Sequence, residues 1–248
     1  MTIKCLAFDL DGTLLLDGSK KIDPRTFDSI QKAMAQGMHI VIASGRDKNG
    51  CKFVYEPLGL ENGNHFLALV NGQIIYDFEN KEYDLDDVLT TEDGIKIQKV
   101  CKEFGVEGIF QCGYDFYSYI SSLNRVKKKV KNAILGEPDD YGLKDGRENR
   151  NFIDLPFEEI RLTQDINKVI MVHTPKFFEK NFDGIKAALS DYDVLLVGPD
   201  WLEIMPKHVS KASALWKICD QLGISMNEVM AFGDAQNDLK MLQQVGIG

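Results

Sequence analysis

Short apolar runs alternate along the chain with longer segments in which apolar residues recur at helical spacing. Residues 4–10 form a nearly continuous apolar run that ends in polar residues, and residues 39–43 form a second one. Runs of this kind are typical of parallel strands that are covered on both faces. The segment between them predicts a helix that begins at about Pro24, with Asp23 as its N-cap and Gly37 as its stop.

The same alternation returns further along the chain. Residues 66–70 predict a third strand, and Asn71-Gly72 turns it into a fourth strand at residues 73–76, as in a hairpin. Near the end of the chain the pattern predicts three elements: a helix from Ser210 to Gly223, a buried strand at residues 229–232, and a helix that opens at Leu239.

The middle of the chain has a different pattern. It predicts helices near residues 92–104 and 177–189, a polar segment at 136–151, and short strands at 108–110, 116–120, 168–172 and 194–197. Because the strand–helix alternation resumes afterwards, this block is interpreted as an insertion. We therefore expect a doubly wound (Rossmann-like) parallel-sheet α/β core at residues 1–84 and 201–248, and an inserted α+β cap domain at residues 85–200.

The composition is that of a globular protein. The chain has 248 residues, of which 44% are hydrophobic and 27% charged, so it can bury one or two cores. A net charge of −9 argues against nucleic-acid binding, because phosphate backbones are bound by Lys and Arg. We expect no signal peptide and no membrane span. The five scattered cysteines predict reduced thiols in a cytoplasmic protein.

Acidic and polar side chains follow several of the predicted strands. Asp9 and Asp11 follow the first strand, Ser44 follows the second, and Asp234 follows the strand at residues 229–232. In open α/β sheets, ligands bind beyond the carboxyl ends of the strands. One pocket can therefore gather these residues with Lys211, which lies one turn inside a predicted helix.

This set of side chains suits a magnesium-bound phosphate. Magnesium takes oxygen ligands in octahedral geometry, and Asp9 and Asp234 would supply carboxylate oxygens while Asp11 supplies its backbone carbonyl. Asp9 could attack the phosphorus atom to give an aspartyl-phosphate. Asp11 would protonate the leaving oxygen and then deprotonate the water that clears the intermediate. Ser44 would donate to a phosphoryl oxygen, and Lys211 would offset its charge.

Four motifs, in order, are similar to those of the haloacid dehalogenase-like (HAD) phosphatases. They are Asp9-x-Asp11-Gly12-Thr13, Ile42-Ala43-Ser44-Gly45-Arg46, Lys211, and Gly233-Asp234-x-x-Asn237-Asp238. The insertion between the second and third motifs resembles the cap of the Cof-type subgroup, many of whose members hydrolyse sugar phosphates or related metabolites. The resemblance spans residues 1–248, and the combination of motifs is highly specific.

The resemblance implies a role for each motif residue. Asp9 would be the nucleophile and Asp11 the acid/base, and Asp9, Asp11 and Asp234 would bind Mg²⁺, with Asp238 and Asn237 orienting that shell. The residues implied in binding the substrate phosphate are Ser44, Gly45, Lys211 and Asn237. The implied partner is a small phosphorylated metabolite, with neither nucleic acid nor membrane, and the cap would set substrate specificity.

Two features depart from the family pattern. The subgroup usually has Gly-Val-x-Lys-Gly around the lysine, whereas this chain has bulkier flanks that can reshape the pocket, His208-Val209-Ser210-Lys211-Ala212. The family also usually continues with another strand segment and a closing helix beyond the point where this chain stops, Val245-Gly246-Ile247-Gly248. We expect the second departure to affect stability more than chemistry.

Each motif taken alone has a simpler interpretation. Asp9 and Asp11 could form a strand-end turn, although not an EF-hand loop, which needs Gly and Glu where this chain has Leu14 and Lys20. The other residues have alternatives of their own: a turn for Ser44, a solvated surface for Lys211, and helix-dipole charges for Asp234 and Asp238. Their order and their positions at strand ends favour the catalytic interpretation.

Three further features stay open from the sequence. Arg46 either supports the phosphate pocket or packs against a carboxylate. The basic run at residues 127–131 is favoured as the solvated face of a cap helix over a phosphate-steering site. His208 flanks Lys211, but the four histidines have no metal-ligand spacing, which favours structural roles.

Two other functions compete with hydrolysis. A phosphomutase of the same superfamily would return the phosphoryl group to a sugar instead of water, and free phosphate would then not accumulate. A non-catalytic phosphometabolite-binding protein is disfavoured by Asp11, because a binder has no need of a second proton-handling carboxylate. The favoured function is magnesium-dependent hydrolysis of small phosphate monoesters.

Overall fold

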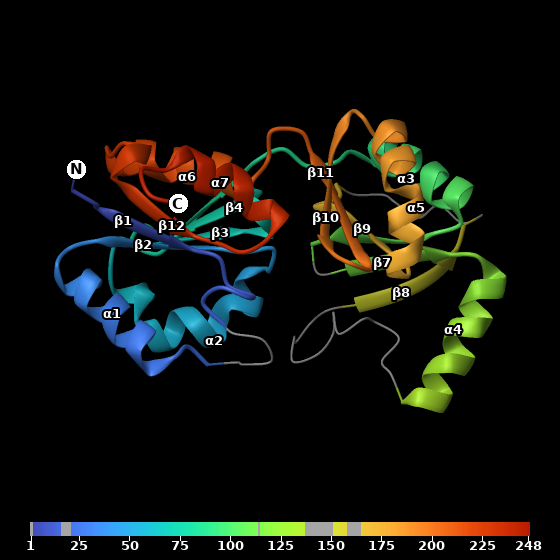
Figure 1. Cartoon of the computed structure of the whole chain (residues 1–248), viewed down its shortest axis with the longest axis horizontal. Helices are drawn as coiled ribbons and strands as arrows, with labels where there is room; N and C mark the ends of the chain where they lie inside the picture. The colour runs from blue at the N-terminus through green and yellow to red at the C-terminus, as the bar shows by residue number, and fades with distance from the viewer. Residues whose placement is uncertain (1, 16–20, 114, 137–150, 158–164) are drawn as a thin grey trace. The chain divides into compact units, whose positions relative to one another are not determined.

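The computed structural model describes residues 2–15, 21–113, 115–136, 151–157 and 165–248. The chain divides into two compact units (Figure 1): the first is Met1–Asp87 with His208–Gly248, and the second is Val88–Lys207. In the described part of the chain the longest helices have 14 residues, and none combines the length and apolar composition that a membrane span requires.

The first unit is built on a six-stranded sheet with the strand order β12-β1-β2-β3-β4-β5. Its strands are β1 (Cys5–Phe8), β2 (His39–Ala43), β3 (Phe66–Leu69), β4 (Ile74–Asp77), β5 (Glu82–Leu85) and β12 (Val229–Phe232). The first four strands in this order are parallel, β4 pairs antiparallel with β3, and β5 pairs antiparallel with β4. The five strands predicted for this unit are confirmed. β5 was not predicted, because all four of its residues are exposed and carry no apolar pattern.

Helices cover both faces of this sheet, as a doubly wound α/β fold requires (Figure 1). They are α1 (Pro24–Ala35), α2 (Lys48–Leu58), α6 (Lys211–Leu222) and α7 (Leu239–Gln244). Ile40 and Ile42 of β2 belong to the core under α1 and α2, whereas Val41 and Ala43 belong to the core under α6 and α7. Successive side chains of a strand point to opposite faces, so a strand between two cores is apolar throughout.

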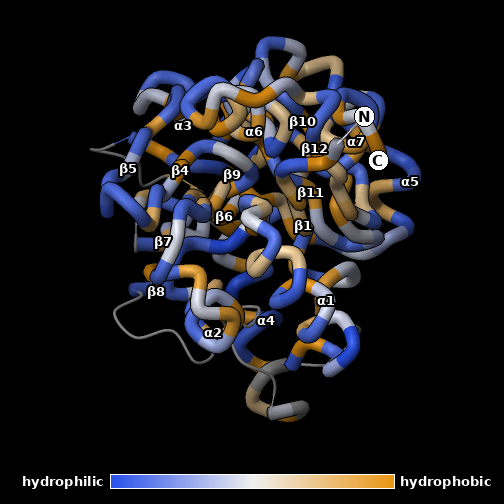
Figure 2. The backbone as a smooth tube through the Cα atoms, turned by 90° about the vertical axis from the view of Figure 1, so that its left-hand side faces the viewer, coloured by the Kyte–Doolittle hydropathy of each residue, from blue (hydrophilic) through white to orange (hydrophobic). Residues whose placement is uncertain are grey.

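Local signals in the sequence set the ends of these helices. The Asp23 side chain accepts a hydrogen bond from the Arg25 backbone N–H at 2.9 Å, which confirms the predicted N-cap of α1. Helix α2 was not predicted, although Asp47 caps it and Gly59 ends it in the left-handed conformation. Figure 2 shows hydrophobic and hydrophilic residues alternating along α1 and α2, as expected for helices with one buried face.

The second unit has its own six-stranded sheet, in the order β10-β11-β9-β6-β7-β8. The strands are β6 (Glu107–Cys112), β7 (Asp115–Ile120), β8 (Asn151–Pro156), β9 (Lys168–Val172), β10 (Tyr192–Gly198) and β11 (Trp201–Pro206), and the helices are α3 (Thr91–Phe104), α4 (Ser122–Leu135) and α5 (Pro175–Ala188). Side chains of α3 and α5 share one core with the sheet. The predicted α+β elements are confirmed, and most of the polar segment at 136–151 lies outside the described residues.

The two boundaries between the units lie a few residues further along the chain than the sequence predicts. Residues 201–206, expected in the core domain, form β11, which pairs with both β9 and β10 in the second sheet. Residues 85–87, expected in the cap, belong to the first unit, and Leu85 pairs with Ile74 there. The structure therefore divides the chain after Asp87 and after Lys207.

Candidate active site

A buried lysine joins two aspartates at the carboxyl ends of the parallel strands. Asp9 directly follows β1, and Lys211 is the first residue of α6. The Lys211 Nζ donates to Asp9 Oδ1 at 2.5 Å and to Asp238 Oδ1 at 2.7 Å. The Lys211 and Asp238 side chains are 0% exposed, so the interpretation of Lys211 as a solvated lysine is wrong.

The position of Lys211 follows from the capping of α6. Ser210 and Ser213 form a reciprocal capping box at the helix N-terminus. Lys211 therefore lies at the first helical position, instead of one turn inside the helix as expected. From there its side chain reaches the two carboxylates, which compensate its buried charge.

The electrostatic environment of Asp9 follows from its burial. Desolvation raises the pKa of the Asp9 carboxyl to about 6, with Lys211 opposing this change and Asp238 adding to it. The carboxyl is therefore largely ionised at neutral pH, yet it binds a proton more readily than an exposed aspartate.

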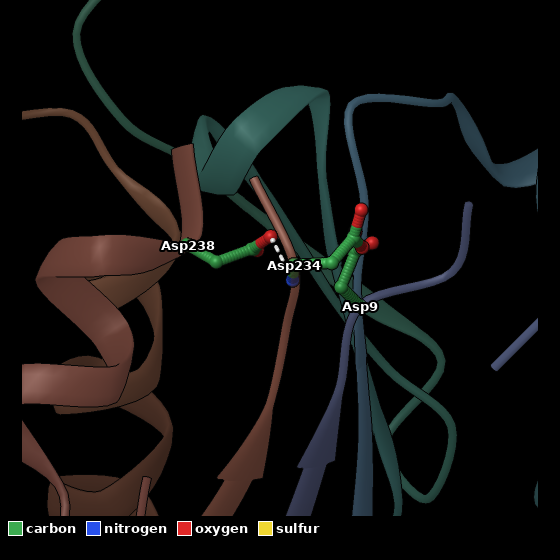
Figure 3. A group of neighbouring side chains, drawn as sticks. All are labelled: Asp9, Asp234 and Asp238. Atoms are coloured by element: carbon green, nitrogen blue, oxygen red, sulfur yellow. Dashed lines mark hydrogen bonds between the residues drawn. The ribbon is translucent and has the colours of Figure 1, made fainter. Parts of the chain in front are cut away.

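Three carboxylates of this site lie close enough to share a cation. One ligand oxygen from each of Asp9, Asp234 and Asp238 lies within 4.8 Å of the others (Figure 3). The Oδ2 atom of Asp238 accepts the backbone N–H groups of Asp234 and Ala235, at 3.2 and 3.0 Å. Both oxygens of Asp238 are thus used within the protein, whereas Asp234 is exposed. Hard carboxylate oxygens fit Mg²⁺.

Asp11 has a different environment. Its side chain is 55% exposed and makes a two-point ion pair with Arg46, Nε to Oδ2 at 2.8 Å and Nη2 to Oδ1 at 2.6 Å. The Asp11 side chain is therefore not part of the carboxylate cluster. This pairing places Arg46 against a carboxylate, which is one of the two roles expected for it.

The remaining predicted phosphate ligands come from the loops after β2 and β12. Ser44 is buried, and its Oγ accepts the Arg46 backbone N–H at 3.2 Å. Asn237 Nδ2 donates to Asn71 Oδ1 at 3.1 Å, and Gly45 packs so closely on Asn71 that a Cβ there would lie 3.1 Å from this same oxygen. Asn71 therefore contacts two of the predicted phosphate ligands, although the sequence indicated it only as part of a turn.

Two residues of the first motif support Asp234. The Thr13 hydroxyl donates to Asp234 Oδ1 at 2.6 Å. Gly12 has a φ of +91°, and a Cβ at this position would lie 2.5 Å from Asp234 Oδ2. Only glycine combines this backbone conformation with so close an approach. The sequence contained both residues within the motif but gave no role to either.

The basic run on α4 is exposed at Lys127 and Lys129, as the sequence favoured. Lys128 is the exception: its Nζ donates to Glu107 Oε1 at 2.8 Å, and its side chain is only 12% exposed.

His208 has a left-handed backbone, with a φ of +76°. This is the position at which the Cof-type subgroup usually has glycine.

The fold and the site define an α/β enzyme of the hydrolase class. The model of the haloacid dehalogenase-like hydrolase family matches residues 6–248, and the chain belongs to this family.

Comparison with individual proteins supports the same assignment. A putative phosphatase of Streptococcus pyogenes is 30% identical over 254 residues, covering 99% of this chain and 86% of the relative. The Bacillus subtilis 5-amino-6-(5-phospho-D-ribitylamino)uracil phosphatase YcsE is 27% identical, covering 99% of this chain and 82% of the relative. The structure of BT4131, a sugar phosphatase of HAD subclass IIB, has a TM-score of 0.75 at 22% identity, covering 99% of this chain and 86% of that one. The chain is a Cof-type hydrolase of the HAD superfamily and a phosphatase.

Proposed function

We propose that this phosphatase hydrolyses small phosphate monoesters of the sugar-phosphate type, in a Mg²⁺-dependent reaction through an aspartyl-phosphate on Asp9. The observation that carries the proposal is Lys211 between Asp9 and Asp238, at the carboxyl ends of β1 and β12. The names of a ribitylamino-uracil phosphatase relative and of a sugar-phosphatase neighbour support a small phosphorylated metabolite.

The chain provides oxygen ligands for the metal. Asp9 and Asp234 would hold Mg²⁺ through side-chain oxygens and Asp11 through its backbone carbonyl. Asp238 would orient this set, because its own oxygens already accept from Lys211 and from two backbone N–H groups. When bound, Mg²⁺ would offset the negative charge of the substrate phosphate.

The reaction uses two carboxylates in succession. An Asp9 oxygen attacks phosphorus and forms an acyl-phosphate bond, while the ester P–O bond breaks and Asp11 gives its proton to the leaving oxygen. Asp11 then takes a proton from water, which attacks phosphorus, releases inorganic phosphate and restores Asp9. Ser44, Gly45 and Asn237 would bind phosphoryl oxygens, and Lys211 would balance their charge.

Arg46 holds the side chain of the proposed proton donor. Because Arg46 donates to both carboxylate oxygens of Asp11 in this structure, the Asp11 side chain must leave Arg46 before it can carry a proton to the leaving oxygen.

We further propose that the second unit, Val88–Lys207, is the cap that selects the substrate. The five cysteines are buried thiols, which supports a reducing, cytoplasmic setting.

The test is phosphate release from a panel of sugar phosphates and other small monoesters, with Mg²⁺ and with a chelator. We expect metal-dependent release by the wild type and by Asp28→Asn, a control at an exposed aspartate on α1. Asp9→Asn should release none. Conversion of a sugar phosphate into an isomer without free phosphate would instead establish a phosphomutase, and binding without turnover would establish a binding protein.

A further inference from the structure

The turn between β3 and β4 has an unusual backbone. Three consecutive residues, Val70, Asn71 and Gly72, have positive φ angles of +49°, +57° and +97°. This conformation is common for glycine and tolerated by asparagine, but it is a genuine outlier for a β-branched residue such as valine. A turn of this kind persists only where the surrounding structure fixes it.

The backbone of this turn holds the loop that carries Ser44. The Val70 N–H donates to the Arg46 carbonyl at 3.0 Å, and the Asn71 N–H donates to the Ser44 carbonyl at 3.0 Å. The turn therefore fixes both sides of Gly45, one of the proposed phosphate ligands.

The same turn packs against the helix that carries Lys211. A Cβ on Gly72 would lie 2.1 Å from the Ser210 carbonyl oxygen and 2.9 Å from the Lys211 backbone nitrogen. Only a residue without a side chain permits this approach. The N-terminus of α6 and the loop after β2 thus share one support.

The Asn71 side chain extends the support to the loop after β12. It is 3% exposed, and its Oδ1 accepts from Asn237 Nδ2 at 3.1 Å. Within the described residues, the other amide atom of Asn237, Oδ1, is buried without a hydrogen-bond partner. In that part of the chain, the orientation of the Asn237 amide therefore depends on Asn71.

We propose that Asn71 is a positioning residue: its side chain orients Asn237 toward the substrate phosphate, while its backbone N–H, which glycine would retain, holds the Ser44–Arg46 loop. This inference rests on the proposed function and adds to it a residue outside the four motifs. Without the Asn71 amide, Asn237 would lose its partner and the phosphate ligands would no longer be held in one arrangement. A small misplacement of this kind lowers the rate without unfolding the protein.

The test compares two glycine substitutions. Asn71→Gly removes the amide but keeps the left-handed backbone free of strain. Lys81→Gly is the matched control, because Lys81 has the same φ of +57° in an exposed turn. We expect Asn71→Gly to lower kcat/KM for phosphate release about tenfold, and Lys81→Gly to leave it unchanged. Both variants should unfold in a cooperative transition above the assay temperature, so that a loss of activity in Asn71→Gly is not a loss of the fold.

A double-mutant cycle shows whether Asn71 acts through Asn237 or independently of it. If Asn71 acts through Asn237, Asn71→Gly combined with Asn237→Ala should lose no more activity than Asn237→Ala alone. Multiplied losses, or full activity of Asn71→Gly, would overturn the inference.

Binding of inorganic phosphate to the Mg²⁺-loaded protein, measured by calorimetry, gives a readout that does not need turnover. Asn71→Gly should weaken it by no more than Asn237→Ala does, and unchanged binding in Asn71→Gly would count against the inference. A wild type that binds phosphate but hydrolyses no ester would refute the proposed function while leaving this comparison intact.

Discussion

Lys211 is a fully buried cation whose charge is matched by Asp9 on one side and Asp238 on the other. Removing one partner of a buried ion pair is costly, because it leaves uncompensated charge in a poorly solvated site. The stability of the first unit and the electrostatics of the site therefore depend on the same side chain.

Lys211→Met should lower the free energy of unfolding by about 3 kcal/mol in chelator at neutral pH, because two buried carboxylates then lack their cation. Urea denaturation measures this loss. The control is Lys217→Met on the same helix, where the lysine is 43% exposed and pairs with Asp84 and Asp86. An exposed pair contributes at most about 1 kcal/mol. Equal losses in the two variants would contradict the compensation argument.

The pKa of Asp9 makes stability depend on pH. Burial raises this pKa from 3.8 to about 6, so the folded state binds the proton more tightly than the unfolded chain does. The contribution of Asp9 to the free energy of unfolding should therefore fall by roughly 3 kcal/mol as pH rises from about 4 to above 6.

Denaturation of the wild type and of Asp9→Asn in chelator, at a series of pH values, measures this contribution as a difference. Asp9→Asn should lack the decline, whereas Asp28→Asn should retain it. Parallel curves for the wild type and Asp9→Asn would show that the Asp9 carboxyl is not perturbed.

The residues of the site were easier to predict from the sequence than their partners were. Asp9, Asp234 and Lys211 could be placed together, because they follow strands or begin a helix at one edge of a parallel sheet, whereas Asp238 was implied only by the family resemblance. Asn71 and Thr13 could not be assigned roles, since a turn residue and a hydroxyl next to a glycine have many structural uses. Their roles depend on contacts with residues 166 and 221 positions away.

At the scale of elements, the start of α6 is determined by the residues before it. Ser210 supplies the cap, but His208, two residues earlier, has a left-handed backbone with an exposed side chain. This conformation costs a non-glycine residue about 1–3 kcal/mol, with histidine among the more tolerant types. The subgroup's usual glycine at this position has a physical reason, which is the backbone angle.

His208→Gly should therefore be more stable than His208→Ala by about 1 kcal/mol, because alanine retains the Cβ that disfavours this angle. Both substitutions remove the imidazole, so their comparison isolates the backbone. Thermal unfolding of the two variants measures the difference. A His208→Ala variant at least as stable as His208→Gly would contradict the argument.

Burial alone did not make an element predictable from the sequence, because helix α2 has a buried face and was not predicted. Strand β2 is apolar at nearly every position because helices cover both of its faces, whereas β5 is exposed throughout. Strand β11 is buried but begins with Trp201 and contains Glu203, so its pattern did not separate it from the following segment. Strand β11 belongs to the second sheet because it pairs with β10 and β9. The hydrophobic periodicity of a strand does not show which strands it pairs with.

At the scale of the whole molecule, a chain of net charge −9 gathers three of its carboxylates, those of Asp9, Asp234 and Asp238, in one site. A divalent cation that binds this site in the folded state stabilises it, by about 2.7 kcal/mol at a hundredfold excess over Kd. We expect Mg²⁺ to raise the unfolding temperature of the wild type. Asp234→Asn should abolish this shift and Asp28→Asn should not. A shift retained in Asp234→Asn would place the cation elsewhere.

The order of the site residues along the chain has a consequence for synthesis. Asp9 and Lys211 are separated by 202 positions, and β1 pairs with β2 early in the sequence but with β12 only at its far end. Contacts of such long range form slowly, because a large loop must close first. While the ribosome is still making the second unit, β1 lacks its neighbouring strand β12, and Asp9 lacks the ammonium group of Lys211. The nascent first unit therefore has an open sheet edge and no working site until residue 238 has emerged, and this is the period in which we expect it to depend most on chaperones.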